Sequence, residues 1–473
     1  MKLIATGTIL SSIVSAQSFG LQNINIRLPF APARGGGGAS AIAETPLSSW
    51  QDLKDKLPAP LSPDERAREP VLTFYRDTNG WCPFCERVWV CIRAKNLPYQ
   101  ERLIPLFDKP EWYKEMVPTT QVPAVLFHSN SNSNSETSNS NTTRALVWES
   151  LDIMKALDDA FPDTTRLVLD TKEYKAASEQ NARLNTAGFG YAYATRNRGN
   201  GTLPLTEAEL QQKNMAFVQA LDELENALVA SGGPFRLGKE FSGIDAEMIP
   251  SLERWRYQLP ITKEPGFDIL EGRPALAAWF QAMDAFAPYS ERVAGDEYSW
   301  VATAAMFARY FGGGDDDVET QATIARSEAV AKGLVGGFQV QFDTDAGDGA
   351  CEARFALEAA RKIVSNHEAI VKDCTNQDPK SQMNVDRSKS QENANLVMQY
   401  VVELLLRGGE AIECARTSPI PSPLMDMKKK QRVDAALAAK TVASRLCVPR
   451  DMSAPAAKVL RAVLMIVADR LVN

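Results

Sequence analysis

Two cysteines separated by two residues stand in the segment NGWCPFCERVW, residues 79–89. This spacing suits a redox pair, half of a zinc site, or two small buried residues. A zinc site needs a second pair of ligands, and no later cysteine has a close partner in the sequence. The pattern therefore favours a redox pair, Cys82 and Cys85, and predicts no metal.

The proline that follows the first cysteine indicates how this cysteine could be activated. Pro83 is favoured in the first turn of a helix, which places Cys82 at the helix N-terminus. Free backbone N–H groups and the helix dipole stabilise a thiolate there, and such cysteines have pKa values of roughly 3.5–7.5, against about 8.5 for a free thiol. No histidine is needed, and the two present, His128 and His367, lie near no candidate nucleophile. Cys85, one turn further, could resolve a mixed disulfide on Cys82.

The elements that position these cysteines follow from the surrounding pattern. A β-branched and aromatic run at 71–75 predicts a strand, and the turn-rich RDTNG leads into a helix at 82–95. Further elements are expected as strands at 99–104, 124–127 and 144–148 and as helices at 109–116 and 149–161. The order βαβαββα is that of a thioredoxin-like domain. Residues 129–143, rich in Ser and Asn, are expected to be an insertion without a chemical role.

After Pro162 the sequence turns helical. Helices are expected at 173–194, 207–230, 244–258 and 274–286. Ser242 and Asp245 have the spacing of a capping box, which marks the start of the third of these helices. Beyond residue 311, apolar positions recur at helical spacing in 355–371, 396–406, 433–448 and 459–471. These stripes predict an additional helical bundle.

The N-terminus is predicted to be a targeting segment. Lys2 precedes an apolar run too short to cross a bilayer, followed by small residues at 14–16, which resembles a signal peptide. Residues 17–43 contain no acidic residue, as in a transit peptide. In series, the two parts resemble a bipartite plastid presequence and predict a plastid location. The alternative is secretion or the ER, which the sequons at Asn141 and Asn200 permit.

Composition excludes some classes of partner. The 473 residues include 52 basic and 59 acidic side chains, a net charge of −7, spread along the chain without a basic patch, so no nucleic-acid partner is expected. No later stretch is apolar enough to span a membrane. A chain that is 44% hydrophobic at this length can bury two or three cores.

Three segments resemble the N-terminal domain of cysteine-type glutathione transferases, especially the omega and lambda classes, with kinship to dehydroascorbate reductases and glutaredoxins. They are WCPFCERVW, DKPEWYKEMVPTTQVPAVL and VWESLDIMKALDDAFPD. The resemblance covers residues 71–162 closely and extends less specifically to about residue 293. Two features depart from it. Cys85 stands where omega and lambda members usually carry Ala, as in glutaredoxins, and the region after about residue 312 has no counterpart.

The resemblance implies a glutathione site. Cys82 would form a mixed disulfide with glutathione, and Phe84 would pack beside it. Lys109 would contact the glycyl carboxylate. The backbone of Val122, followed by a cis Pro123, would pair with the cysteinyl part.

At the other end of glutathione, the resemblance implies that Glu149 and Ser150 hold the γ-glutamyl group. The implied activity is that of a glutathione-dependent thiol transferase or reductase, which removes glutathione from mixed disulfides or reduces dehydroascorbate. Glutathione is then the co-substrate, the second substrate is a small molecule or a protein thiol, and a homodimer is compatible with the family. The alternative is a non-catalytic interaction module whose C-terminal helices bind a protein partner.

The expected fold class is an α+β thioredoxin-like N-terminal domain, an all-α glutathione-transferase C-terminal domain and an additional α-helical bundle. The expected boundaries are a presequence at 1–45, a linker at 46–70, the glutathione-binding domain at 71–163, the all-α domain at 164–310, a linker at 311–350 and a helical extension of unassigned role at 351–473.

Overall fold

A computed structural model describes most of the chain. The described residues are 47–58, 68–128, 145–194, 205–263, 266–311, 317–336, 350–375, 388–408, 412, 415–417 and 420–473. The expected presequence and the expected insertion at 129–143 lie outside these ranges.

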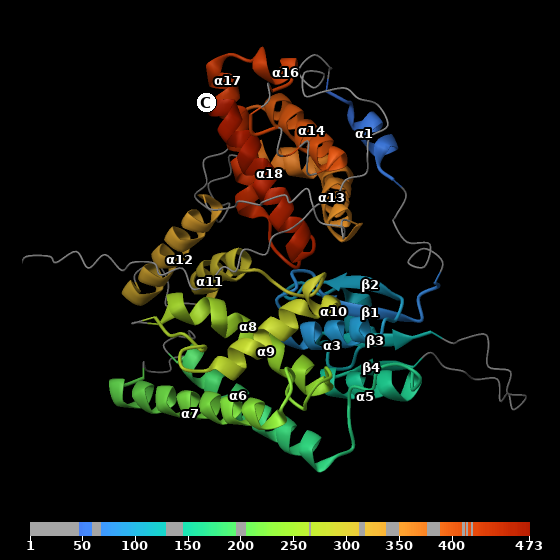
Figure 1. Ribbon diagram of the computed structural model, residues 1–473, viewed down its shortest axis with the longest axis vertical. Coiled ribbons are helices and arrows are strands. Elements are labelled where there is room, and N and C mark those ends of the chain that lie inside the picture. Colours follow the sequence, from blue (N-terminus) through green and yellow to red (C-terminus); the bar gives the residue numbers. More distant parts are fainter. Residues whose placement is uncertain are drawn as a thin grey trace, which may run out of the picture.

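A four-stranded mixed sheet forms the base of the N-terminal domain (Figure 1). Its strands, in spatial order, are β2 (Tyr99–Ile104), β1 (Leu72–Asp77), β3 (Ala124–Phe127) and β4 (Leu146–Trp148). β1 runs parallel to β2 and antiparallel to β3, and β3 is antiparallel to β4. All six residues of β1 are buried because it is an inner strand. The thioredoxin-like arrangement expected from the sequence is confirmed.

Three helices complete this domain: α3 (Pro83–Ala94), α4 (Glu111–Met116) and α5 (Ser150–Ala160). The core face of α3 carries Val88, Trp89 and Ile92, each at most 1% exposed. This burial fixes the start of α3 relative to the end of β1, and therefore the position of the two cysteines.

The second domain contains α6 (Lys172–Ala192), α7 (Glu207–Ser231), α8 (Gly243–Thr262), α9 (Pro274–Ala285) and α10 (Ala287–Ser290). α8 is its central helix and is buried along most of its length. The capping box is confirmed, since Asp245 Oδ2 accepts hydrogen bonds from Ser242 N and Oγ, both at 2.9 Å. α8 continues beyond the expected end at 258 because tertiary packing outweighs the helix-breaking effect of Pro260.

The C-terminal region forms a helical bundle with a core of its own. Its helices are α13 (Ala350–Thr375), α14 (Gln391–Arg407), α16 (Ser422–Met425), α17 (Lys429–Arg445) and α18 (Ala454–Val472). Two more helices, α11 (Glu297–Phe311) and α12 (Val318–Gly336), pack against each other beside α8. In Figure 1 the bundle stands above the sheet and the α6 to α9 helices.

The segment before the sheet packs on the bundle rather than on the sheet. Its helix α1 (Trp50–Lys56) lies against α13 and α14. The Trp50 indole donates to Asn395 Oδ1 at 3.0 Å and stacks on His367 with ring centroids 4.3 Å apart. Both α1 and α12 fall in ranges expected to be linkers. Each helix carries a short apolar face that only its tertiary neighbour completes.

Candidate functional site

The two cysteines lie where the chain passes from β1 into α3. Cys82 is the N-cap residue of α3, with extended backbone angles and a half-buried side chain, and Pro83 is the first helical residue. Cys85, one turn later, is only 1% exposed. Cys91 faces the core further along the helix, where burial raises its pKa, so it is inert as a nucleophile.

The surroundings of Cys82 favour its thiolate. The Cys85 thiol donates a hydrogen bond to Cys82 Sγ, which lowers the pKa of Cys82. Backbone N–H groups of Cys85 and Phe84 act in the same direction, while burial and the Asp77 carboxylate oppose them. For Cys85 the balance is reversed, because burial above all, and then the bond to Cys82, raise its pKa well above the ordinary value. The pair therefore divides into an activated and a protonated thiol.

The backbone before β3 approaches the first cysteine. Cys82 Sγ lies 3.8 Å from the carbonyl oxygen of Val122. The Val122–Pro123 peptide bond is cis, as the resemblance implied. The Tyr113 hydroxyl on α4 donates to Gln121 O at 2.7 Å and holds this segment in place.

The start of α5 supplies a second group of expected residues. Glu149 precedes the helix with an exposed side chain and φ of 69°, a left-handed conformation that is costly for a residue with a Cβ. Ser150 is buried, and its Oγ accepts a hydrogen bond from Arg87 Nη1 at 2.9 Å. The same guanidinium lies 5.6 Å from the Phe84 ring, which is half exposed.

The structure thus brings Cys82, Cys85 and Val122 into contact. Arg87 joins Phe84 to Ser150. Lys109, half-buried just before α4, takes part in none of these contacts.

Sequence reasoning missed three side chains at this site, namely Asp77, Arg87 and Arg254. Asp77 ends β1 and is fully buried, and its Oδ2 accepts the backbone N–H of Trp81 at 2.7 Å. A carboxylate oxygen of Asp77 and the sulfurs of Cys82 and Cys85 lie within 4.8 Å of one another. A structural zinc site takes four protein ligands, and the described part of the chain offers three here. The only sequence signal was an acidic residue at a strand end, which also suits a turn.

Arg254 of α8 joins the second domain to the cysteine loop. Its Nη1 pairs with Glu86 Oε2 at 2.7 Å, and both side chains are less than 10% exposed. Its Nη2 donates to the carbonyl oxygen of Trp81 at 3.0 Å. The guanidinium also lies 4.3 Å from the centre of the Trp300 ring on α11. No local pattern in the sequence marks this residue, since Trp81, Glu86 and Trp300 are all more than 40 positions away from it in the chain.

The C-terminal bundle also reaches this loop. A Cβ placed on Gly80 would lie 2.8 Å from Pro449 Cγ, so the backbone of Gly80 lies close to the proline ring. Arg292 Nη1 donates to the Pro449 carbonyl oxygen at 2.8 Å. On the other side, the Trp81 ring meets Phe307 of α11 with centroids 5.7 Å apart. Pro449, which lies outside the two expected glutathione-transferase domains, therefore packs against Gly80 directly before the cysteine pair.

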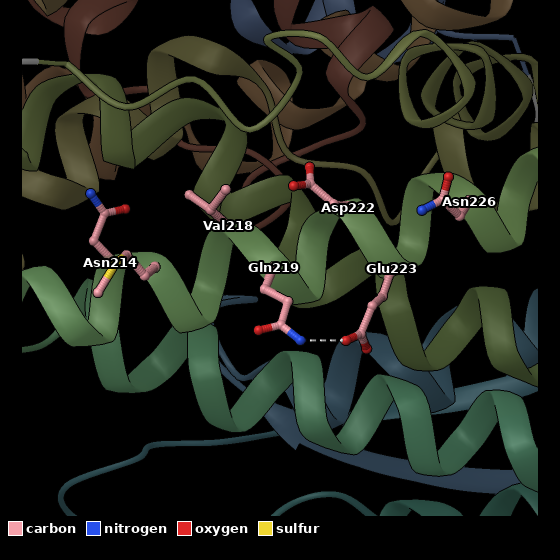
Figure 2. A pocket seen from close by; sticks show the side chains of 7 residues that line it. Asn214, Val218, Gln219, Asp222, Glu223 and Asn226 are labelled. Atoms are coloured by element: carbon pink, nitrogen blue, oxygen red, sulfur yellow. Dashed lines mark hydrogen bonds between the residues drawn. The ribbon is translucent and has the colours of Figure 1, made fainter.

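Two surface hollows lie away from the cysteines. Figure 2 shows a shallow groove along α7, lined by side chains such as Asn214, Val218 and Asp222. The other hollow lies between α5 and α6, beside Lys155 and Arg166. Neither hollow includes an expected site residue. We therefore place the candidate site by its chemistry, at the start of α3.

Comparison with known proteins assigns the family. Residues 81–160 match the family model "Glutathione S-transferase, N-terminal domain", and residues 207–282 match "Glutathione S-transferase, C-terminal domain". Glutathione S-transferase L2, chloroplastic, of Arabidopsis thaliana is 31% identical over 234 residues, which cover 48% of this chain and 70% of that protein. The chain belongs to the glutathione S-transferase family, which is a family of enzymes.

Two further proteins are similar to this chain. Glutathione S-transferase DHAR3, chloroplastic, of Arabidopsis thaliana is 27% identical and covers 38% of this chain and 57% of its own length. The solved dehydroascorbate reductase of Chlamydomonas reinhardtii is 21% identical, with a TM-score of 0.37, and covers 55% of this chain and 98% of its own. Among the described residues, no helix is both long and apolar enough to cross a membrane.

Proposed function

We propose that this protein is a glutathione-dependent thiol transferase with Cys82 as its nucleophile. The observation that carries this proposal is the position of Cys82. It is half-buried at the start of α3, it accepts a hydrogen bond from the Cys85 thiol, and its pKa is lowered. A thiolate in this setting attacks a disulfide sulfur. Conjugation of glutathione to an electrophile would instead call for a Tyr or Ser hydroxyl beside the glutathione thiol.

The reaction runs in two displacements. Cys82 Sγ attacks the glutathione sulfur of a mixed disulfide, so that a Cys82–glutathione bond forms and the substrate leaves as a thiolate that takes up a proton. A second glutathione thiolate then attacks the glutathione sulfur of this bond, which releases Cys82 and oxidised glutathione. Alternatively, Cys85 attacks Cys82 Sγ, which releases glutathione and leaves a Cys82–Cys85 disulfide that glutathione reduces. Reduction of dehydroascorbate requires two electrons and two protons, which two glutathione molecules supply as they become oxidised glutathione.

Glutathione would lie along the edge formed by the segment before β3 and the start of α5. The Val122 backbone, 3.8 Å from Cys82 Sγ, would pair with its cysteinyl part. The strained backbone of Glu149 supports a ligand role at the other end, because such conformations cluster at binding sites. The Ser150 N–H at the helix start would bind the γ-glutamyl carboxylate, and Lys109 would bind the glycyl carboxylate. In this assignment residues 71–163 bind glutathione.

The test compares wild type with Cys82→Ser and Cys85→Ser, using a glutathionylated peptide and dehydroascorbate as substrates and glutathione as reductant. We expect Cys82→Ser to lose activity by roughly two orders of magnitude or more, because a hydroxyl at neutral pH is a poor nucleophile. Activity that survives in Cys85→Ser would establish a route through one thiol. An inactive wild type, or a fully active Cys82→Ser, would overturn the proposal.

We also propose a plastid location. The relatives named chloroplastic and the presequence pattern expected from the sequence support it. A fluorescent protein fused behind residues 1–70 and expressed in an algal cell should accumulate in the plastid. Fluorescence in the ER or the medium would instead support the secreted alternative.

A further inference from the structure

Asp77 is buried beside the cysteines, and one of its two carboxylate oxygens accepts no hydrogen bond from the described residues. Its side chain is 0% exposed, and Oδ2 is held by the Trp81 N–H at 2.7 Å. Among the described residues, Oδ1 has no hydrogen-bond partner. A buried carboxylate oxygen without a donor is costly, so its presence calls for an explanation.

The neighbour that needs a base is Cys85. Its thiol is 1% exposed, and burial above all raises its pKa well above the ordinary value, so it is protonated at neutral pH. A thiol must lose its proton before it can attack a disulfide. Because solvent reaches Cys85 poorly, the acceptor has to come from the protein.

Among the described charged and titratable groups around Cys85, Asp77 is the one that can accept its proton. Cys82 Sγ receives the Cys85 hydrogen bond in the free enzyme, but in the mixed disulfide this sulfur is bonded and no longer anionic. Tyr113 is neutral, because burial raises its pKa, and its hydroxyl donates to Gln121 O. Glu86 is paired with Arg254 and lies outside the 4.8 Å cluster. Asp77 lies inside it.

We propose that Asp77 is the base that accepts the Cys85 proton when Cys85 displaces glutathione from Cys82. This step rests on the proposed function and describes how its second route, through Cys85, proceeds. The proton moves from Cys85 Sγ to an Asp77 oxygen, directly after a small rotation or through one water, since the separation is no more than 4.8 Å.

The electrons balance within the same step. Cys85 Sγ forms a bond to Cys82 Sγ, the Cys82–glutathione bond breaks, and glutathione leaves with the electron pair as a thiolate. The two cysteines are oxidised to a disulfide and the glutathionyl group is reduced. Two further glutathione molecules then reduce the disulfide and are released as oxidised glutathione, and Asp77 returns its proton.

A purely structural role for Asp77 has a different signature. The carboxylate holds the loop before Cys82 by accepting a hydrogen bond from Trp81 N–H. An asparagine could accept the same hydrogen bond through its side-chain carbonyl oxygen. Asp77→Asn therefore preserves the loop contact and removes the base. Cys85→Ser is the matched control, because it can form the Cys82 adduct but cannot form the disulfide.

The experiment mixes reduced full-length protein with oxidised glutathione in the presence of a chelator, quenches with acid at successive times and measures masses. The glutathione adduct and the internal disulfide differ in mass, so the two steps are read separately from about pH 6 to about pH 10. In Asp77→Asn we expect the adduct to accumulate and its conversion to fall by about tenfold or more near neutral pH. The difference in conversion rate between Asp77→Asn and wild type should disappear at high pH, where hydroxide deprotonates Cys85.

Two outcomes overturn the assignment while leaving the proposed function intact. One is an unchanged conversion rate in Asp77→Asn, and the other is a rate lowered equally at every pH, which indicates a loop anchor. Should Asp77→Asn not fold, the wild-type profile decides. An internal base gives a conversion rate nearly flat through neutral pH, whereas dependence on hydroxide gives a steep continuous rise. Absence of any adduct in wild type would instead overturn the proposed function, and this assignment with it.

Discussion

The Cys85 thiol donates a hydrogen bond to Cys82 Sγ, and this bond lowers the pKa of Cys82 more than any other contact does. The buried Cys85 therefore contributes to the activation of the half-buried Cys82, whether or not it later forms a disulfide. This gives Cys85 a role that can be measured without any substrate.

Removal of that donor should weaken the nucleophile. In Cys85→Ala we expect the pKa of Cys82 to rise, because the thiolate loses its strongest hydrogen bond, and the thiolate fraction at neutral pH to fall. The pH dependence of alkylation by iodoacetamide, followed at Cys82 by mass spectrometry, measures this. Cys85→Ser keeps a hydroxyl donor and should move the midpoint less. An unchanged midpoint in Cys85→Ala would show that the backbone N–H groups suffice.

Relief of the strained backbone at Glu149 should separate stability from binding. Glu149→Gly accommodates the φ of 69° without steric cost and should raise the free energy of unfolding by about 1 kcal/mol. Glu149→Ala keeps the strain and should not. Both variants lose the carboxylate and should bind glutathione more weakly by calorimetry. Equal stability of the Gly and Ala variants would contradict the strain argument.

The contact between Gly80 and Pro449 predicts that the bundle supports the site. In Gly80→Ala the new Cβ would meet Pro449 Cγ at 2.8 Å, in addition to the strain of φ +71°. We expect a loss of roughly 1–3 kcal/mol in unfolding free energy and slower alkylation of Cys82.

Gly272→Ala is the matched control for this variant, because it has the same φ of +71° and no atom within 4 Å of the added Cβ. It should show the backbone cost alone and leave the Cys82 alkylation rate at the wild-type value. If the two alanine variants behave alike, the Pro449 contact has no influence on the cysteine.

Glu253 should make stability depend on pH. Burial raises its pKa to about 8, and its Oε1 accepts hydrogen bonds from the Tyr289 hydroxyl and from Gly295 N. The folded state therefore holds a proton that the unfolded state releases above pH 4.5. The contribution of the protonated Glu253 carboxyl to the free energy of unfolding is complete below pH 4.5 and is lost as the pH rises towards about 8.

Glu253→Gln mimics the protonated carboxyl and should remove this part of the pH dependence. Chemical denaturation at several pH values between about 5 and about 8 should show a smaller decline in unfolding free energy for the variant than for wild type. Parallel declines would mean that Glu253 is ionised in the folded protein.

Local patterns predicted most helices and strands because their signals lie within a few residues. The capping box of Ser242 and Asp245 is an example, since the two residues are three positions apart and bond to each other. α1 and α12 were missed for the opposite reason. Trp50 of α1 is held by residues distant in the chain, Asn395 and His367, and α12 is held by packing on the helices α11 and α8.

The sequence by itself determined the start of α3. Pro83 and the apolar face of the helix are local features, and they place Cys82 at the N-terminus with Cys85 one turn inside. Only the tertiary structure decided what surrounds the pair. Asp77 approaches the sulfurs because β1 and α3 pack together, Arg254 comes from α8, and Pro449 comes from the bundle. Such contacts depend on how whole elements pack, and the spacing of residues along the chain does not encode that in any short pattern.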